Sequence, residues 1–288
     1  PRGSLGAGVG LQPKRSSRSV AEFKVVANLA PLTDDNSKLR QWDMKMVNAL
    51  KGMTEEMIRG NAFDIARACG SLANRNEGQM EVYLAKHIKA KDVEALQLSI
   101  LVAAATGDKD LLEQRREMAL EAGGPGYVER THFTAARAYE RMNAYEESRQ
   151  AYAKVTDGDS TRADAWLGQS RVAWRQIEKI DPRELTEQQL EPIESTLRQA
   201  KRQIDSLGRH KLWKAEIFRI LGEIQLRRSD FGAAAKFLEK ARTFLPKDTL
   251  LVERVAHVLR LGGDFSGSMA TWEALLKMAP NSEPGIVG

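Results

Sequence analysis

Side chains that could carry out catalysis or bind a metal ion are few and scattered in this sequence. The single cysteine, Cys69, lies in an apolar stretch, where a thiol is typically buried and unreactive. The four histidines fall on separate predicted helices: His87, His132, His210 and His257. One cysteine and four separated histidines supply too few ligands for a zinc site, and the H-E-x-x-H, G-x-S-x-G and P-loop motifs are absent. We therefore predict no enzymatic activity, no cofactor and no metal site.

The N-terminal segment is basic and rich in glycine. Pro1-Arg2-Gly3-Ser4 is typical of the remnant of a thrombin-cleavable tag, so we interpret residues 1–20 as this remnant followed by a flexible basic arm. The glycines of residues 6–10 are similar to a dinucleotide-binding loop, but no strand precedes them and no helix follows, which argues against a nucleotide site. Residues 21–54 are predicted to form a separate segment with one amphipathic helix.

The positive net charge of the chain is concentrated in its N-terminal 50 residues. Of the formal net charge of +5, residues 1–50 contribute +4, with eight basic and four acidic side chains, so the rest of the chain carries only +1. A nearly neutral body disfavours purely electrostatic binding of nucleic acid. No apolar run approaches the ~18 residues of a membrane-spanning helix. We favour the cytoplasm and keep the periplasm or an organelle as alternatives, because the native N-terminus is not visible; the oligomeric state is left open.

From residue 55 onward the pattern indicates helices throughout. Apolar residues recur at three- and four-residue spacing in segments separated by short polar or glycine-containing turns, and no alternating pattern is strong enough to form a sheet. The hydrophobic content of 42% is sufficient for a large core. We predict an all-α fold in which residues 55–288 form one helical-repeat domain of antiparallel helices.

The helices recur with a fixed period in the C-terminal third. The interval from Pro246 to Pro280 equals the interval from Phe231 to Phe265, and an aspartate precedes each phenylalanine at a predicted turn. The predicted repeats begin near Glu129, Ala163, Ala215 and Thr249. The interval from Ala163 to Ala215 exceeds one period by about half, so the repeat that begins at Ala163 contains an insertion.

Helix-capping residues place this insertion in the second helix of that repeat. Asp181 followed by Pro182 is typical of a helix start, and a second capping box runs from Thr186 to Gln189. We predict a single enlarged second helix that continues to about Asp205.

This periodicity resembles the tetratricopeptide repeat (TPR). The clearest repeat carries Leu221-Gly222, the turn aromatic Phe231, the small residues Ala234 and Ala241, and the terminal Pro246. The last repeat keeps Ala256, Phe265, Ser268, Trp272 and Pro280, but has Leu275 where the family has a small residue. The resemblance is clearest over residues 211–282, moderate over 129–175 and weak over 55–128.

The resemblance implies a right-handed α-solenoid whose first helices line a concave groove. The residues that the repeat register assigns to this groove, and that we predict to bind a partner, are Arg130, Arg137, Arg141, Arg171, Trp174, Arg175, Arg219, Arg227, His257 and Arg260. All formal cations among them are arginines, which bind carboxylate or phosphate through two parallel hydrogen bonds.

These observations predict a non-enzymatic scaffold or adaptor that binds a protein or peptide segment, acidic in character, in its groove during complex assembly. The alternative is an RNA-binding helical-repeat protein that uses the groove arginines and the basic N-terminal arm on phosphates. The carboxylate clamp by which some TPR proteins hold chaperone tails requires lysine and asparagine at set groove positions, and this sequence does not supply them.

Overall fold

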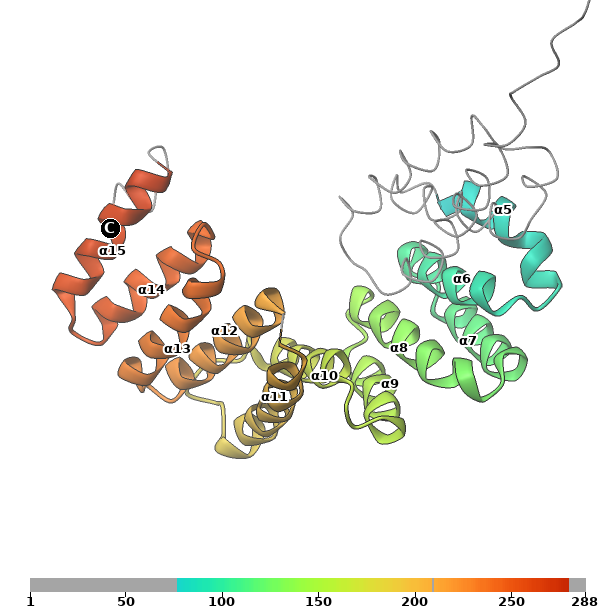
Figure 1. The fold of residues 1–288 in the computed structure, drawn as a ribbon, viewed down its shortest axis with the longest axis horizontal. Coiled ribbons are helices and arrows are strands. Elements are labelled where there is room, and N and C mark those ends of the chain that lie inside the picture. The colour runs from blue at the N-terminus through green and yellow to red at the C-terminus, as the bar shows by residue number, and fades with distance from the viewer. Residues whose placement is uncertain (1–76, 209, 280–288) are drawn as a thin grey trace, which may run out of the picture. The chain divides into compact units, whose positions relative to one another are not determined.

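The computed structural model describes residues 77–208 and 210–279. Every regular element in these ranges is an α-helix, as predicted (Figure 1). The helices are α5 (Glu77–Lys89), α6 (Val93–Thr106), α7 (Lys109–Gly123), α8 (Pro125–Arg141), α9 (Tyr145–Gly158), α10 (Ala163–Ile177), α11 (Glu187–Leu207), α12 (Lys211–Arg227), α13 (Phe231–Phe244), α14 (Thr249–Leu261) and α15 (Phe265–Met278). The predicted arm over 1–20, the helix within 21–54 and Cys69 lie outside the described residues.

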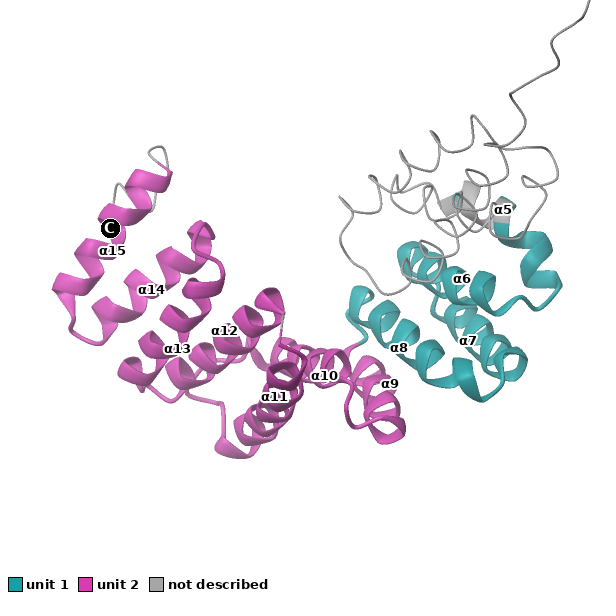
Figure 2. Ribbon diagram, viewed as in Figure 1, with its two compact units in different colours: residues 1–144 teal, residues 145–288 magenta. Residues whose placement is uncertain are grey.

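The chain forms two compact units, divided between α8 and α9 (Figure 2). Unit 1 comprises residues 1–144 and contains α5 to α8, and unit 2 comprises residues 145–288 and contains α9 to α15. The two helices of the repeat predicted near Glu129 therefore belong to different units.

Unit 1 is organised around α6, which packs against α5, α7 and α8. All residues from 95 to 104 are buried, which is the pattern of a helix that is covered on every side. The one long polar side chain in this stretch, Gln97, donates from Nε2 to Oγ1 of Thr131 on α8 at 3.0 Å. This buried hydrogen bond joins α6 to α8 and partly offsets the cost of removing the amide from water.

The turns between α12 and α13 and between α14 and α15 repeat the same local geometry. Ser229 and Gly263 adopt left-handed backbone conformations, with φ of 59° and 81°, and reverse the chain direction. Asp230 and Asp264 follow them and accept the backbone N–H three residues further on, at 2.9 Å and 2.8 Å. The aspartates predicted at these turns are thus the N-caps of α13 and α15.

Small residues allow the paired helices of unit 2 to pack closely. Ala234 on α13 is fully buried beside Gly222 on α12, where an added Cβ would lie 2.7 Å from a side-chain carbon of Leu238. In the next pair, the hydroxyl of Ser268 on α15 donates to the carbonyl oxygen of Ala256 on α14 at 2.9 Å. The small positions predicted by the repeat pattern therefore occupy the helix crossings.

The predicted enlarged helix is α11, which has 21 residues. It begins at the second capping box, where the backbone N–H of Thr186 donates to Oε1 of Gln189 at 2.9 Å. The start predicted at Asp181 is wrong: Asp181 closes a tight turn by accepting the N–H of Arg183 at 2.9 Å, and the chain does not become helical until Glu187. Two adjacent capping signals were present, and the apolar spacing needed for a helix begins only after the second.

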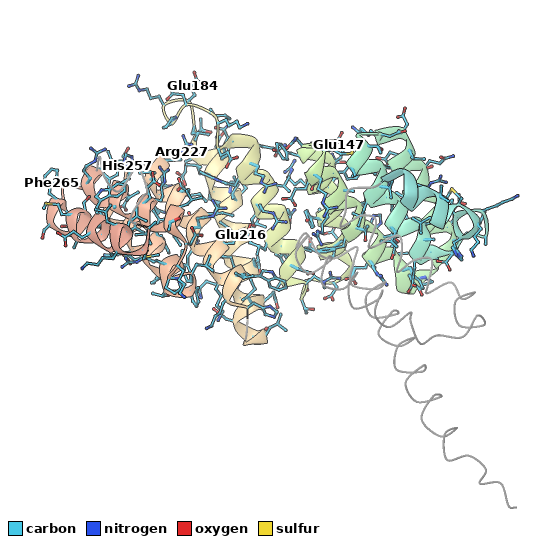
Figure 3. The ribbon with its side chains drawn as sticks, turned by 90° about the horizontal axis from the view of Figure 1, so that it is seen from above. Glu147, Glu184, Glu216, Arg227, His257 and Phe265 are labelled. Carbon is cyan, nitrogen blue, oxygen red and sulfur yellow. The ribbon has the colours of Figure 1, made fainter. Side chains whose placement is uncertain are left out.

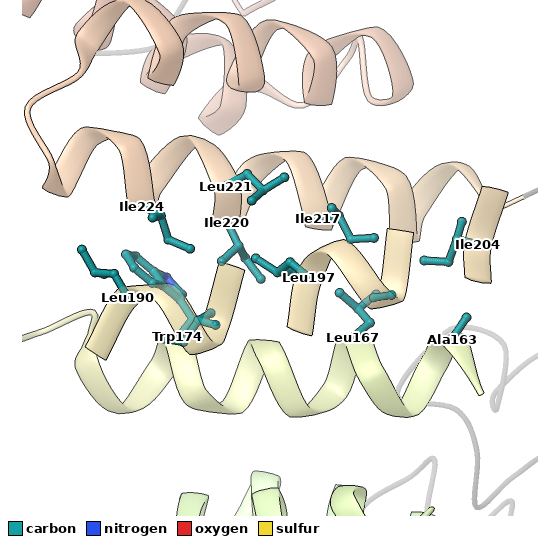
Figure 4. Close-up of a cluster of buried hydrophobic side chains, with 12 residues drawn as sticks. Ala163, Leu167, Trp174, Leu190, Leu197, Ile204, Ile217, Ile220, Leu221 and Ile224 are labelled. Carbon is teal, nitrogen blue, oxygen red and sulfur yellow. The ribbon is translucent and has the colours of Figure 1, made fainter. Parts of the chain in front are cut away.

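One core of unit 2 lies between α10, α11 and α12 (Figure 4). Leu197 of α11 is completely buried, and Trp174 of α10 and Ile220 of α12 belong to the same cluster. A second core, formed by α12, α13 and α14, contains Leu238 and Val255. Because α12 contributes to both, it holds the successive helix pairs of unit 2 together.

Candidate partner-binding surface

The three predicted groove arginines of α8 lie in unit 1 and differ in exposure. Arg137 is only 5% exposed, Arg130 is half-buried, and Arg141 is exposed. Burial lowers the pKa of Arg130, and the nearby carboxylate of Glu94 partly offsets this effect. Arg137 is too deeply buried to contact a partner unless its surroundings rearrange.

The remaining predicted residues belong to unit 2, on or beside one side of α10, α12 and α14. We call this side the first-helix face, and it carries Arg171, Arg175, Glu216, Arg219, Glu223, Glu253, Arg254, His257 and Arg260. Figure 3 labels Glu216 on α12 and His257 on α14. The face therefore combines five arginines with three glutamates.

An ion pair joins the first two helices of this face. The Arg171 side chain of α10 lies 3.3 Å from the carboxylate of Glu216 on α12, and both are about one-fifth exposed. The same guanidinium also donates to the hydroxyl of Tyr152 on α9 at 3.5 Å. Arg171 is consequently held in position by its neighbours and is only partly available to a partner.

A second ion pair joins α12 to α14. Arg254 donates to Glu223 through two parallel hydrogen bonds, of 2.7 Å from Nε and 2.5 Å from Nη2. The hydrogen bonds from Glu223 raise the pKa of Arg254 against the opposing effect of burial. Sequence reasoning missed Arg254, because the repeat register assigned the adjacent Glu253 to the groove.

Two residues that we predicted to bind a partner, Trp174 and Arg227, instead make contacts within unit 2. Trp174 is 3% exposed and belongs to the core between α10, α11 and α12. Arg227 donates to the backbone carbonyls of Glu178 and, at 3.2 Å, Ile180, and its guanidinium lies 5.9 Å from the Trp174 ring centroid. Arg227 thus stabilises the C-terminal end of α10, next to the loop that carries Glu184 in Figure 3.

Three arginines of the first-helix face are exposed: Arg175, Arg219 and Arg260. His257 lies close to Arg260, with its Nδ1 atom 3.5 Å from a guanidinium nitrogen. Burial, together with the positive charges of Arg254 and Arg260, lowers the pKa of His257. The imidazole is therefore mainly neutral at pH 7, and the positive charge of the face comes from arginine.

The described residues contain no group of three histidine, cysteine, aspartate or glutamate side chains able to hold a metal ion. Over the same ranges, none of the helices combines the length and apolar character required to cross a bilayer.

Comparison with known proteins identifies the fold. No family model and no curated protein matches this sequence. Among solved structures, the chain is similar to one in the APC/C hetero-tetramer Cut9–Hcn1, with a TM-score of 0.58, 12% identity and coverage of 92% of this chain and 46% of that one. It is also similar to PilF of Pseudomonas aeruginosa, with a TM-score of 0.56, 12% identity and coverage of 78% of this chain and 94% of PilF.

A third similar structure is PilW, a type IV pilus biogenesis factor, with a TM-score of 0.55, 16% identity and coverage of 77% of this chain and 94% of PilW. This chain spans slightly less than half of the matched chain of the Cut9–Hcn1 complex. Sequence identities this low support a similarity of fold only. The protein has a TPR-like helical-repeat fold, an all-α solenoid, as the spacing of its small and aromatic residues predicted.

Proposed function

We propose that the protein is a non-catalytic scaffold that binds an acidic segment of a partner protein on the first-helix face of unit 2. The observation that carries this proposal is the pairing of two of the three glutamates on this face, which leaves Glu253 against the three exposed arginines. Glu216 and Glu223 are each held by an arginine from a neighbouring helix, so their charges already have partners. The exposed Arg219 and Arg260 are not offset by these two glutamates and can meet the carboxylates of a partner.

The ion pairs also support the proposal by fixing the helices that present the exposed arginines. Arg171 and Arg254 bridge α10 to α12 and α12 to α14, which limits the rearrangement needed when a partner binds. Arg141 of unit 1 is an additional proposed contact because it is exposed, and Arg130 remains one despite being half-buried. We leave Trp174 and Arg137 out of the proposed surface because both are buried.

A scaffold function agrees with the descriptions of two of the similar structures. PilW is described as a pilus biogenesis factor, and Cut9 with Hcn1 forms a hetero-tetramer. Both descriptions concern assembly, and we carry only this general role to the present chain. RNA binding is the alternative, and the basic arm that would contribute to it lies outside the described residues.

Titration with a fluorescently labelled oligo-glutamate tests the proposal, with oligo-lysine and an unstructured RNA as comparison ligands. We expect the protein to bind oligo-glutamate, and the affinity to fall as salt rises from about 50 mM to about 500 mM, because the Debye length shortens from over about 10 Å to under about 5 Å. Tighter binding of RNA than of oligo-glutamate would favour the alternative. Oligo-glutamate affinity that does not change with salt would contradict the proposed role of the arginines.

A further inference from the structure

Unit 2 contains a pocket away from the first-helix face. Its lining residues come from α11, α12 and α13, and its volume is about 510 Å³. The lining residues are Glu194, Arg198, Lys201, Phe218, Leu221, Phe237, Lys240, Thr243 and Phe244. A volume of this size is sufficient for a large side chain together with its neighbours.

Three phenylalanines form the apolar part of the pocket. The rings of Phe218 and Phe244 are nearly parallel, with centroids 6.0 Å apart, and Phe237 lies 6.3 Å from Phe218. All three are only half-buried, so part of each ring faces the pocket instead of the core. Partly exposed rings gain free energy when another apolar or aromatic group covers them.

Basic side chains surround these rings. The ammonium group of Lys240 lies 5.7 Å from the Phe218 ring centroid and 5.9 Å from that of Phe237. Arg198 and Lys201 of α11 complete the basic rim. Arg198 already pairs with Glu194 at 2.7 Å and Lys201 with Asp205 at 2.6 Å, so Lys240 supplies most of the uncompensated positive charge beside the rings. A cation beside an aromatic surface attracts an aromatic group bearing nearby negative charge.

The one carboxylate of the lining is already occupied. Glu194 is 12% exposed and accepts hydrogen bonds of 2.7 Å from both Arg228 and Arg198. Burial alone would raise the pKa of Glu194, but these hydrogen bonds hold it below its ordinary value, so the carboxylate remains charged. Glu194 forms ion pairs with Arg198 and Arg228, and not with Lys240.

We propose that this pocket is a second docking site, which receives an aromatic side chain flanked by acidic residues from a partner protein. The aromatic side chain covers Phe218, Phe237 and Phe244, and the flanking carboxylates meet Lys201, Lys240 and Arg198. The basic N-terminal arm of the chain itself is a poor occupant, because its Lys14, Arg15 and Arg18 would face cations of the same sign. The site shares α12 with the first-helix face, but none of its lining residues belongs to that face.

A labelled dodecapeptide with a central tryptophan between paired glutamates tests this proposal on the full chain. We expect saturable binding, weakened at least about tenfold when alanine replaces the tryptophan, because buried aromatic anchors dominate such interfaces. A peptide with lysines in place of the glutamates should not bind. No saturable binding below about 1 mM, or equal binding of the tryptophan and alanine peptides, would overturn the proposal.

Two pocket variants and one matched control locate the binding. Lys240→Glu reverses a rim charge and Thr243→Trp fills the pocket mouth; both residues are exposed, so neither change disturbs the core. Each should weaken peptide binding about tenfold or more. Lys247→Glu, at an exposed position outside the pocket, should leave binding nearly unchanged.

Variants of the first-helix face distinguish this site from the proposed function. Arg219→Glu with Arg260→Glu should leave the binding of the tryptophan peptide within about threefold, the change expected from long-range electrostatics, whereas Thr243→Trp should leave oligo-glutamate binding unchanged. If the first-helix variants abolished tryptophan-peptide binding and the pocket variants did not, the pocket would not be the site. Tighter binding of oligoadenylate than of the tryptophan peptide would also overturn the proposal.

Discussion

Replacing Leu197 with alanine is expected to lower the free energy of unfolding by about 2–5 kcal/mol. Leu197 is completely buried between α10, α11 and α12, so its truncation leaves a cavity bounded by three helices. The same cluster joins α11 to both α10 and α12. Urea denaturation followed by circular dichroism measures the change.

Leu207→Ala is the matched control for this prediction. This variant also replaces a leucine of α11 with alanine, but the Leu207 side chain is 56% exposed. It should change the free energy of unfolding by no more than about 0.5 kcal/mol. Equal denaturation midpoints for the two variants would show that α11 does not pack through Leu197 as described.

The double replacement Arg219→Glu and Arg260→Glu is expected to weaken oligo-glutamate binding about a hundredfold, because two attractive contacts become repulsive. Both side chains are exposed, so helix content and the melting temperature should remain close to those of the parent protein. Fluorescence titration at low salt measures the affinity, and circular dichroism measures the fold.

Arg183→Glu with Arg202→Glu provides the control for charge. Both arginines are exposed in unit 2 but lie outside the first-helix face, and their reversal changes the net charge by the same amount. We expect this control to lose less than about threefold in affinity, through long-range electrostatics alone. An equal loss in both double variants would mean that net charge, and not the first-helix face, determines binding.

Much of the fold was predictable because it depends on local patterns that repeat. The aspartates at 230 and 264, the small residues at 234 and 256 and the constant repeat period follow from capping and from close helix crossings, which limit the residue types allowed. The last repeat departs from the family pattern at Leu275, where the family has a small residue. Leu275 is nevertheless buried, so this position still packs in the core of the repeat.

The binding surface was less predictable because it depends on contacts between helices far apart in sequence. A repeat register indicates which side of a helix faces a groove, but not that Arg227 turns to the end of α10 or that Trp174 lies in the core. The pairing of Glu223 with Arg254 depends on the offset between α12 and α14. The pocket depends on the separation of α11 from α13, and its signal in the sequence was the insertion that lengthens one repeat.

A photo-crosslinking amino acid at position 250 tests most directly whether the first-helix face binds a partner protein. Leu250 is 75% exposed at the start of α14, one turn before Arg254, so the probe leaves every arginine in place. A second protein carries the probe at Leu207, exposed at the end of α11. After irradiation in a cell extract, mass spectrometry should identify acidic protein segments attached to position 250 and few attached to position 207. Crosslinks from position 250 mainly to RNA, or equal capture at both positions, would contradict the account.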